Sequence, residues 1–230
     1  MEHAEWYRIE AGEAVATLES DLRRGLTDEQ VQTKRRQYGW NELEEEPGKA
    51  VWAMFFDQFK EYLVILLFIA AIVSGVLGEW LDAAVIMAIV ILNALIGVFQ
   101  EYKAEQSLAA LKKLSAPNAK TLRSGHLKSL PSRELVPGDI IILEAGDFVP
   151  ADVRLIETAN LKIEEAALTG ESVPVEKAST LLTEELPLGD QKNLAFMGTV
   201  VTYGRGKAVV TKTGMKTEIG QIANLLKQAV

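Results

Sequence analysis

The sequence has 230 residues, with 24 Lys and Arg against 32 Asp and Glu, and therefore a net charge of −8. Apolar residues make up 48% of the chain and charged residues 24%, which is ordinary for a folded protein and excludes wholesale disorder. The absence of cysteine excludes disulfide scaffolds, cysteine zinc sites, iron–sulfur clusters and thiol catalysis. The acidic balance argues against a nucleic-acid partner, because such a protein needs a basic face to neutralise phosphates.

The first segment, residues 1–60, is expected to be a lead-in that contains helices. Thr27 and Gln30 have the spacing of a capping box, and Gly39 is placed to end the helix that follows them. Aromatic residues at helical spacing then predict an amphipathic helix over 51–59, of a kind that lies at a membrane surface. These aromatic residues are Trp52, Phe55, Phe56 and Phe59.

Residues 61–100 hold two apolar runs with the composition of membrane spans. Each run, 62–78 and 83–99, has seventeen residues and no charge, which is the lower limit for a helix that crosses a bilayer. Eleven Leu, Ile, Val or Phe in the first run and ten in the second each favour insertion by about 0.3–0.6 kcal/mol. The alternative is a buried hairpin of a soluble protein, but neither run has the polar stripe of a soluble helix. We therefore expect a transmembrane helical hairpin.

Basic residues flank this hairpin and are absent from it. The turn between the two runs carries only the charges of Glu79 and Asp82, so the positive-inside rule places both ends of the hairpin in the cytoplasm. Helix-forming residues continue past the second run and predict one helix from about Asp82 to Leu114, which ends before Pro117. Residues 101–116 of this region are expected to form a stalk. The flanking basic residues are Lys49, Lys60, Lys103, Lys112 and Lys113.

After Pro117 the pattern changes to short β-type segments that are separated by Gly, Pro and Asp turns. Their spacing predicts a mainly β domain over 117–216, an antiparallel sandwich or distorted jelly roll. A final helix is expected over 217–230. The predicted fold class is a mixed membrane protein with N-terminal helices, a transmembrane hairpin with a long stalk, and a mainly β domain. The expected strands include 119–123, 140–143, 153–157, 173–176, 199–202 and 207–212, with a further β-type segment at Leu135.

One loop, residues 168–174, carries the strongest candidate chemistry. Gly170 permits the backbone angles of a tight turn, and Pro174 sets the exit from it. A glutamate held outward there, Glu171, is able to accept a proton from water and to direct that water at an electrophile. The alternative is an exposed acidic turn without chemistry, and the residues by themselves favour it because solvated loop glutamates are common.

Thr169-Gly170-Glu171-Ser172 resembles the actuator-domain signature of the P-type ion-pumping ATPases. Other stretches resemble the same family in their order and spacing, so the resemblance covers essentially the whole chain. It is nearest to the calcium-pump branch. The further stretches are Gly25-Leu26-Thr27, residues 38–43, residues 93–101, Val136-Pro137-Gly138-Asp139, residues 146–152 and Thr217-Glu218-Ile219-Gly220.

The resemblance implies an ATP-driven pump that transfers the γ-phosphate of ATP to an aspartate. In such pumps the actuator domain rotates, and its signature loop reaches the phosphorylated aspartate. Glu171 is then the glutamate that positions the hydrolytic water, while Thr169, Gly170 and Ser172 shape and dock the loop. The stalk would carry the rotation to the membrane.

The family's phosphorylation sequence, Asp-Lys-Thr-Gly-Thr, does not occur in these 230 residues. The resemblance therefore implies that ATP and Mg²⁺ are bound by domains outside this sequence, and that these residues alone neither hydrolyse ATP nor transport an ion. The implied partners are the lipid bilayer, a transported cation, taken as Ca²⁺ from the branch, and the remaining phosphorylation, nucleotide and transmembrane domains. The implied protein is integral to a membrane, with its N-terminus and actuator domain in the cytoplasm.

Three alternatives stay open on the sequence. The same region would serve in a sodium/potassium or proton pump, because these share the actuator loop. A stand-alone, membrane-anchored regulatory or structural domain without catalysis is a different class of protein. Glu61, at the start of the first apolar run, is interpreted as an interfacial residue, with a place near a cation path as the alternative.

Overall fold

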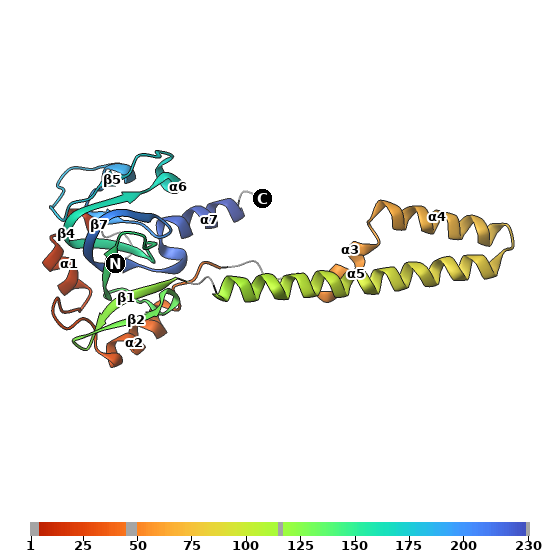
Figure 1. The fold of residues 1–230 in the computed structure, drawn as a ribbon, viewed down its shortest axis with the longest axis horizontal. Helices are drawn as coiled ribbons and strands as arrows, with labels where there is room; N and C mark the ends of the chain where they lie inside the picture. Colours follow the sequence, from red (N-terminus) through yellow and green to blue (C-terminus); the bar gives the residue numbers. More distant parts are fainter. Residues whose placement is uncertain (1–4, 45–49, 115–116, 229–230) are drawn as a thin grey trace. The chain divides into compact units, whose positions relative to one another are not determined.

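The computed structural model describes residues 5–44, 50–114 and 117–228 of the chain (Figure 1). These residues fall into two units. The sheet unit comprises residues 5–44 and 117–228, and the helical unit comprises residues 50–114. Each unit has its own internal packing and is described by itself.

The N-terminal part of the sheet unit is helical, with η1 (Trp6–Arg8), α1 (Ala11–Thr17) and α2 (Asp28–Tyr38). The predicted capping box at the start of α2 is confirmed. The Thr27 hydroxyl oxygen accepts a hydrogen bond from the Gln30 backbone N–H (3.3 Å), and the Gln30 side chain accepts one from the Thr27 N–H (2.8 Å). Gly39 ends the helix with a φ of 78°, a positive value that glycine adopts without strain.

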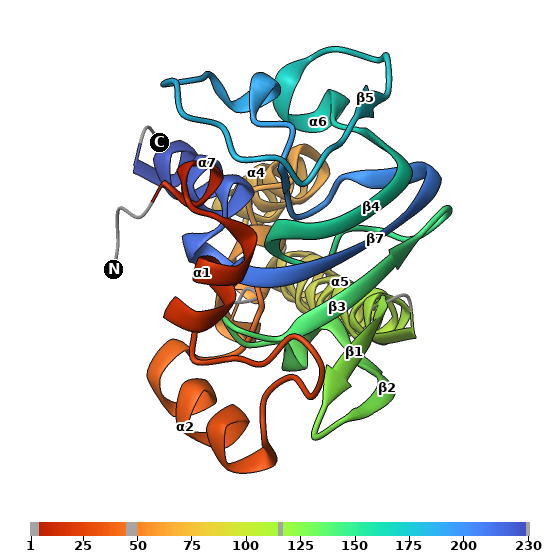
Figure 2. The same ribbon diagram turned by 90° about the vertical axis from the view of Figure 1, so that its left-hand side faces the viewer.

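Seven strands form one antiparallel sheet, in the order β2-β1-β3-β7-β4-β5, with β6 paired to β4 (Figure 2). The predicted antiparallel β domain is confirmed, but the sandwich or jelly roll is not, because these strands join in a single sheet. The strands are β1 (Asn118–Arg123), β2 (His126–Pro131), β3 (Ile140–Glu144), β4 (Asp152–Glu164), β5 (Val175–Glu176), β6 (Leu194–Ala195) and β7 (Val200–Lys212). The connections include η2 (Ser132–Glu134), α6 (Ala166–Thr169), η3 (Leu188–Asp190), η4 (Gly214–Lys216) and the last helix, α7 (Glu218–Gln228).

The predicted strands 199–202 and 207–212 are in fact one long strand, β7. Gly204 interrupts the apolar pattern in its middle, at a point where β7 passes very close to β4. A β-carbon at Gly204 would lie 2.2 Å from the Asn160 carbonyl oxygen, so glycine is required there. The register between the two strands shifts beside this contact, between Ala159 and Lys162. Strands β2 and β6 were not predicted, and Leu135 lies outside any strand, directly after η2.

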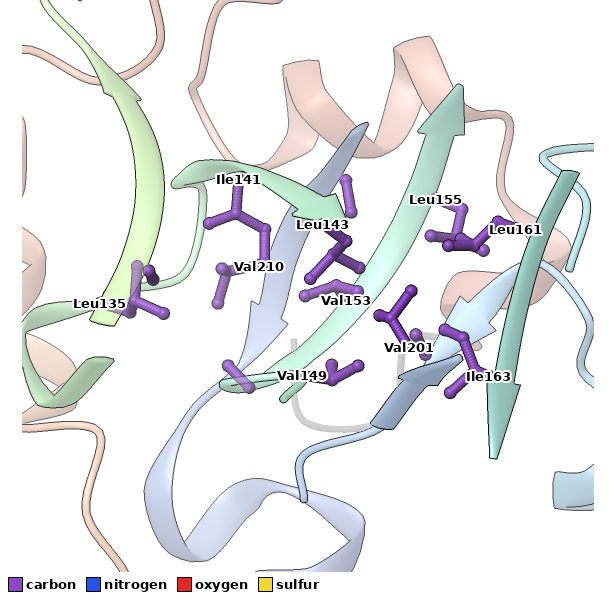
Figure 3. Packing of buried hydrophobic residues seen from close by; sticks show 14 of the residues in the cluster. Leu135, Ile141, Leu143, Val149, Val153, Leu155, Leu161, Ile163, Val201 and Val210 are labelled. Atoms are coloured by element: carbon purple, nitrogen blue, oxygen red, sulfur yellow. The ribbon is translucent and has the colours of Figure 1, made fainter. Parts of the chain in front are cut away.

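Both faces of the sheet carry buried apolar residues. Consecutive residues of one strand point to opposite faces, so Ile141 and Val210 belong to one cluster and Ile140 and Val209 to another. Figure 3 shows the first cluster between the central strands. The second cluster joins the sheet to Trp6, Tyr7, Ala14, Val15 and Leu18 of the N-terminal segment. Burial of each large apolar side chain contributes roughly 1.5–3 kcal/mol, so the lead-in helices are part of the folded sheet unit.

A buried ion pair shapes the turn before β3. The Arg123 guanidinium donates to both carboxylate oxygens of Asp139, at 2.8 and 2.6 Å. Asp139 also accepts the backbone N–H of Val136 at 2.8 Å and is fully buried. Such a two-pronged guanidinium–carboxylate contact fixes orientation as well as supplying energy. Asp139 therefore fixes the conformation of the turn over residues 136–139.

Asn41 joins three segments that are distant in the sequence. Its side-chain amide donates to the carbonyl oxygens of Ser132 (3.0 Å) and Pro150 (2.8 Å), and its Oδ1 accepts the Gly214 N–H at 2.8 Å. The residue is 4% exposed, so water does not replace these partners. The lead-in is thus pinned to the start of β4 and to the connection between β7 and α7.

The helical unit consists of α3 (Val51–Gln58), α4 (Tyr62–Val76) and α5 (Trp80–Leu114). The continuous helix predicted from about Asp82 to Leu114 is confirmed by α5. The segment Trp80–Ser107 is long and apolar enough to cross a membrane, and only 11% of its most apolar window is buried. Helices α3 and α4 pass the same test together, as a pair bent by 63° at their junction. The apolar surface of this unit is therefore largely exposed rather than packed as a soluble core.

The first test concerns the joint at Asn41. The variant Asn41→Ala leaves two buried carbonyl groups and one buried N–H without this partner, and each such loss costs about 1–3 kcal/mol. We expect a fall of several degrees in the thermal unfolding midpoint of the detergent-solubilised chain, followed by intrinsic fluorescence. The exposed Asn224→Ala in α7 is the matched control and should shift the midpoint little. Equal midpoints for the two variants would contradict the proposed joint.

Asp152 forms a second joint, between the start of β4 and the start of α7. Its carboxylate accepts the backbone N–H groups of Met197 (2.9 Å) and Glu218 (2.8 Å). Burial raises the pKa of Asp152 from 3.8 to about 6, while these two hydrogen bonds act in the opposite direction. The nearby charge of Glu218 adds to the rise and that of Lys212 opposes it.

This raised pKa predicts a pH-dependent stability. Because the folded chain binds the Asp152 proton more tightly than the unfolded chain, protonation stabilises the fold fully below about pH 4, and this contribution is lost as the pH rises through 6. We therefore expect the stability of wild type, relative to Asp152→Asn, to fall by about 2 kcal/mol between pH 4 and pH 6. Thermal unfolding of both proteins across that range measures the difference, with the exposed Asp190→Asn as control. A difference that does not change with pH would refute the raised pKa.

Candidate functional site

The loop that carries the sequence-predicted residues connects β4 to β5. After β4 ends at Glu164, the chain passes through Glu165, the single helical turn α6, and an exposed segment over 170–174, and then returns as β5. Strand β5 pairs back onto β4, with Lys162 opposite Glu176 and Ile163 opposite Val175. Figures 1 and 2 both place α6 and β5 together at one end of the sheet, with α2 at the other end. The loop is therefore an outward projection with both ends tied to one strand.

Gly170 ends α6 in the left-handed conformation, with φ 77° and ψ −5°. The unusual backbone angle expected from the sequence is thus confirmed at this position. No atom lies within 4 Å of the place where a β-carbon would stand, so the conformation and not the space favours glycine here.

Two hydrogen bonds of the Thr169 hydroxyl connect the backbone of Glu171 to that of Glu165. The Thr169 hydroxyl donates to the carbonyl oxygen of Glu165 at 3.1 Å. The same hydroxyl oxygen accepts the backbone N–H of Glu171 at 3.3 Å. Thr169 thus links the end of β4 to Glu171, which is a local reason for a threonine at this position.

The side chains at the tip of the loop face solvent. Gly170, Glu171, Ser172 and Pro174 are exposed, and Val173 is 74% exposed. In the described part of the chain, the Glu171 carboxylate has no hydrogen-bond or ion-pair partner. A pocket of about 740 Å³ in the sheet unit is lined by residues outside this loop. An exposed carboxylate on a projecting tip binds no substrate by itself, so any chemistry requires an electrophile presented by another surface.

The helical turn α6 packs against buried residues of the sheet unit. Leu168 packs against the buried cluster that includes Phe196, together with Leu188 of η3. A β-carbon at Gly189 would lie 3.4 Å from the methyl group of Thr169, so η3 closely approaches the turn. The exposed tip of the loop, residues 170–174, therefore follows a helical turn that is itself packed against the sheet unit.

A buried ion pair that the sequence analysis did not single out lies at the base of the loop. Glu165 and Lys177 are 2.5 Å apart between the carboxylate Oε1 and the ammonium Nζ, and both side chains are fully buried. Burial raises the pKa of Glu165 and lowers that of Lys177, and the pairing opposes both changes. One signal was available: Glu165, directly after β4, continues the alternation of the buried residues Leu161 and Ile163, so the glutamate falls on the buried face.

The remaining sequence candidates lie elsewhere. Glu61 is exposed and directly precedes α4, in the helical unit. Among residues 5–44, 50–114 and 117–228, no three His, Cys, Asp or Glu lie close enough together to hold a metal ion. No step of the chemistry below passes through a metal ion bound to these residues.

Comparison with known proteins identifies both units. A family model described as the P-type ATPase actuator domain matches residues 113–227. A second, described as the N-terminus of cation transporters and ATPases, matches residues 6–74. The first match covers half of the chain and includes the candidate loop.

Several curated proteins are similar over nearly the whole sequence. A calcium-transporting ATPase of Bacillus cereus is 51% identical over 229 residues, which cover 97% of this chain and 26% of that protein. One of Listeria monocytogenes is 48% identical over 98% of this chain and 26% of its own length. A cation-transporting ATPase of Synechocystis is 46% identical over 94% of this chain and 24% of its own.

The chain spans about a quarter of the length of these relatives. The two family models cover the lead-in, α3, most of α4 and the sheet with its candidate loop, and the similarity to the curated relatives extends over nearly the whole chain. The chain therefore belongs to the P-type ATPase family, of which it carries the N-terminal and actuator-domain regions.

Proposed function

We propose that this chain is the N-terminal part of an ATP-driven Ca²⁺ pump in which Glu171 directs water at an aspartyl phosphate carried by another domain. The observation that carries the proposal is the exposed, backbone-anchored Glu171 at the tip of the actuator loop. An exposed carboxylate at the tip of a loop is suited to act on a substrate that another domain presents. In this proposal ATP and Mg²⁺ are bound by the phosphorylation and nucleotide domains, outside this sequence.

The proposed step is the hydrolysis of an acyl phosphate. The Glu171 carboxylate takes a proton from a water molecule as the water oxygen forms a bond to phosphorus. The bond between phosphorus and the aspartate oxygen breaks, so that inorganic phosphate and a free aspartate carboxylate result. General-base catalysis by a positioned side chain contributes about 10²–10⁴-fold in rate. Gly170 and Thr169 set the direction of Glu171, and Ser172 is proposed to dock the loop on the phosphorylated surface.

The helical unit is proposed to span the membrane as a hairpin over 61–100, continued by a stalk over 101–116. The exposed apolar surfaces of α4 and α5 support this, because they suit contact with lipid tails and not with water. The basic residues on the outer sides of the hairpin support a cytoplasmic location for the N-terminal segment 1–60, for the actuator domain 117–216 and for the helix 217–230. In this proposal the stalk transmits actuator motion to the spans.

The catalytic role is tested in the complete pump with the variant Glu171→Gln. We expect phosphoenzyme to form from ATP as in wild type and then to decay at least 10²-fold more slowly, because the amide cannot take up the water proton. The measurement is the decay of ³²P-labelled phosphoenzyme after a chase with unlabelled ATP. Glu176→Gln, an exposed glutamate five residues further along the chain, is the matched control and should leave the decay unchanged. Decay at the wild-type rate in Glu171→Gln would refute the role and would favour a non-catalytic domain.

The choice of Ca²⁺ rests on the names of the relatives in Bacillus and Listeria, whereas the Synechocystis relative is named only for cations. If the proposal holds, phosphoenzyme formation by the complete pump from ATP depends on Ca²⁺ and is not supported by Na⁺ or by a change of proton concentration alone. Phosphorylation at fixed pH, with each ion added separately, measures this dependence. Phosphorylation that is stimulated by Na⁺ and indifferent to Ca²⁺ would place the chain in another branch of the family.

A further inference from the structure

The two ends of the actuator loop meet through one pair of charges. Glu165 is the first residue after β4, and Lys177 is the first residue after β5. Their side chains form the 2.5 Å contact between carboxylate and ammonium, and the Lys177 backbone N–H also donates to the Leu161 carbonyl at 2.8 Å. The eleven residues 166–176 between them hold all the proposed catalytic positions. We call this pair the loop clasp.

The clasp is isolated from water, and a further charge that acts on it is that of Lys192, which disfavours the charged form of Lys177. Both side chains are fully buried, and among the described residues neither has another ion-pair or hydrogen-bond partner. The Lys177 ammonium also lies 5.7 Å from the ring centroid of Phe196, a member of the second buried cluster. An ion pair in such surroundings is weak support for overall stability, because the cost of removing two charges from water offsets their attraction. The pair nevertheless keeps its two side chains together, because each buried charge has only the other as an ion-pair partner among the described residues.

A chain of contacts leads from the clasp to Glu171. The side chain of Glu165 is held by Lys177, while its carbonyl oxygen accepts the Thr169 N–H at 3.0 Å and the Thr169 hydroxyl at 3.1 Å. The Thr169 hydroxyl oxygen in turn accepts the Glu171 N–H. A displacement of Glu165 would therefore move Thr169 and, with it, the backbone of Glu171.

We propose that Glu165 and Lys177 are positioning residues, whose buried pair closes the base of the loop and fixes the direction in which Thr169 presents Glu171. This inference rests on the proposed hydrolysis of an aspartyl phosphate by Glu171-directed water. Neither residue touches the reacting atoms. Their loss should slow hydrolysis of the phosphoenzyme and leave its formation from ATP unaffected, because formation does not use the loop.

The test uses the complete pump and three variants: Glu165→Gln, Lys177→Met, and the double variant Glu165→Leu/Lys177→Met. Each single variant leaves one charge buried without its partner and is expected to unfold at a lower temperature. The double variant removes both charges and fills the site with apolar side chains, so its thermal unfolding midpoint should return to that of wild type. In this folded double variant we expect phosphoenzyme decay at least 10-fold slower than in wild type, with phosphorylation by ATP within 2-fold. The double variant carries the test wherever a single variant fails to fold.

The matched control is the exposed pair of Lys120 and Glu144 on the same sheet, replaced in the same way as Glu144→Leu/Lys120→Met. It should change neither rate. Wild-type decay in the double clasp variant would overturn the positioning role and would leave the pair a purely structural one. Glu171→Gln, measured alongside, separates the two hypotheses. Fast decay in Glu171→Gln defeats the proposed function, whereas slow decay there with fast decay in the clasp variant defeats only the positioning role.

Discussion

The antiparallel ladder between β4 and β7 is the constraint on which the sheet unit depends. It extends from Asp152 opposite Lys212 to Glu164 opposite Val200, and both clusters of buried residues are built on it. Strand β4 begins at the residue that caps α7 and ends beside the residue that starts the actuator loop. Thirteen residues at about 3.3 Å each place these two features at most about 43 Å apart along one strand. The loop and the last helix are therefore attached to opposite ends of the same strand.

Buried polar side chains make the joints around this ladder. Asn41 pins the lead-in, Asp139 holds the turn before β3, and Asp152 caps α7. Each satisfies backbone groups that would otherwise be buried without partners, which is costly in a protein interior. All three lie in stretches that resemble the pump family, so part of that resemblance is explained by structural joints. The exposed Glu171 differs from them, because its carboxylate accepts no hydrogen bond from the described part of the chain.

Local signals predicted local structure well. The capping box at Thr27, the helix end at Gly39, the long helix α5 and the turn at Gly170 depend on neighbouring residues, and each was found where expected. The continuity of β7 was missed because Gly204 is explained by a close approach of Asn160 from another strand, which no short window contains. The candidate loop was predicted from its resemblance, whereas the pair at its base required knowledge of which side chains are buried. The single connected sheet likewise depends on pairings between distant segments.

The two edges of the sheet have a consequence for the newly made chain. An open strand edge offers unpaired N–H and C=O groups that recruit another chain, which leads to aggregation. At one edge β2 carries Lys128 and ends at Pro131, which has no N–H to donate. On the other side of the sheet, β4 is followed by β5 and β6, which have only two residues each. Neither edge is a good template for a further strand, so the sheet unit is protected against edge-to-edge association as it folds.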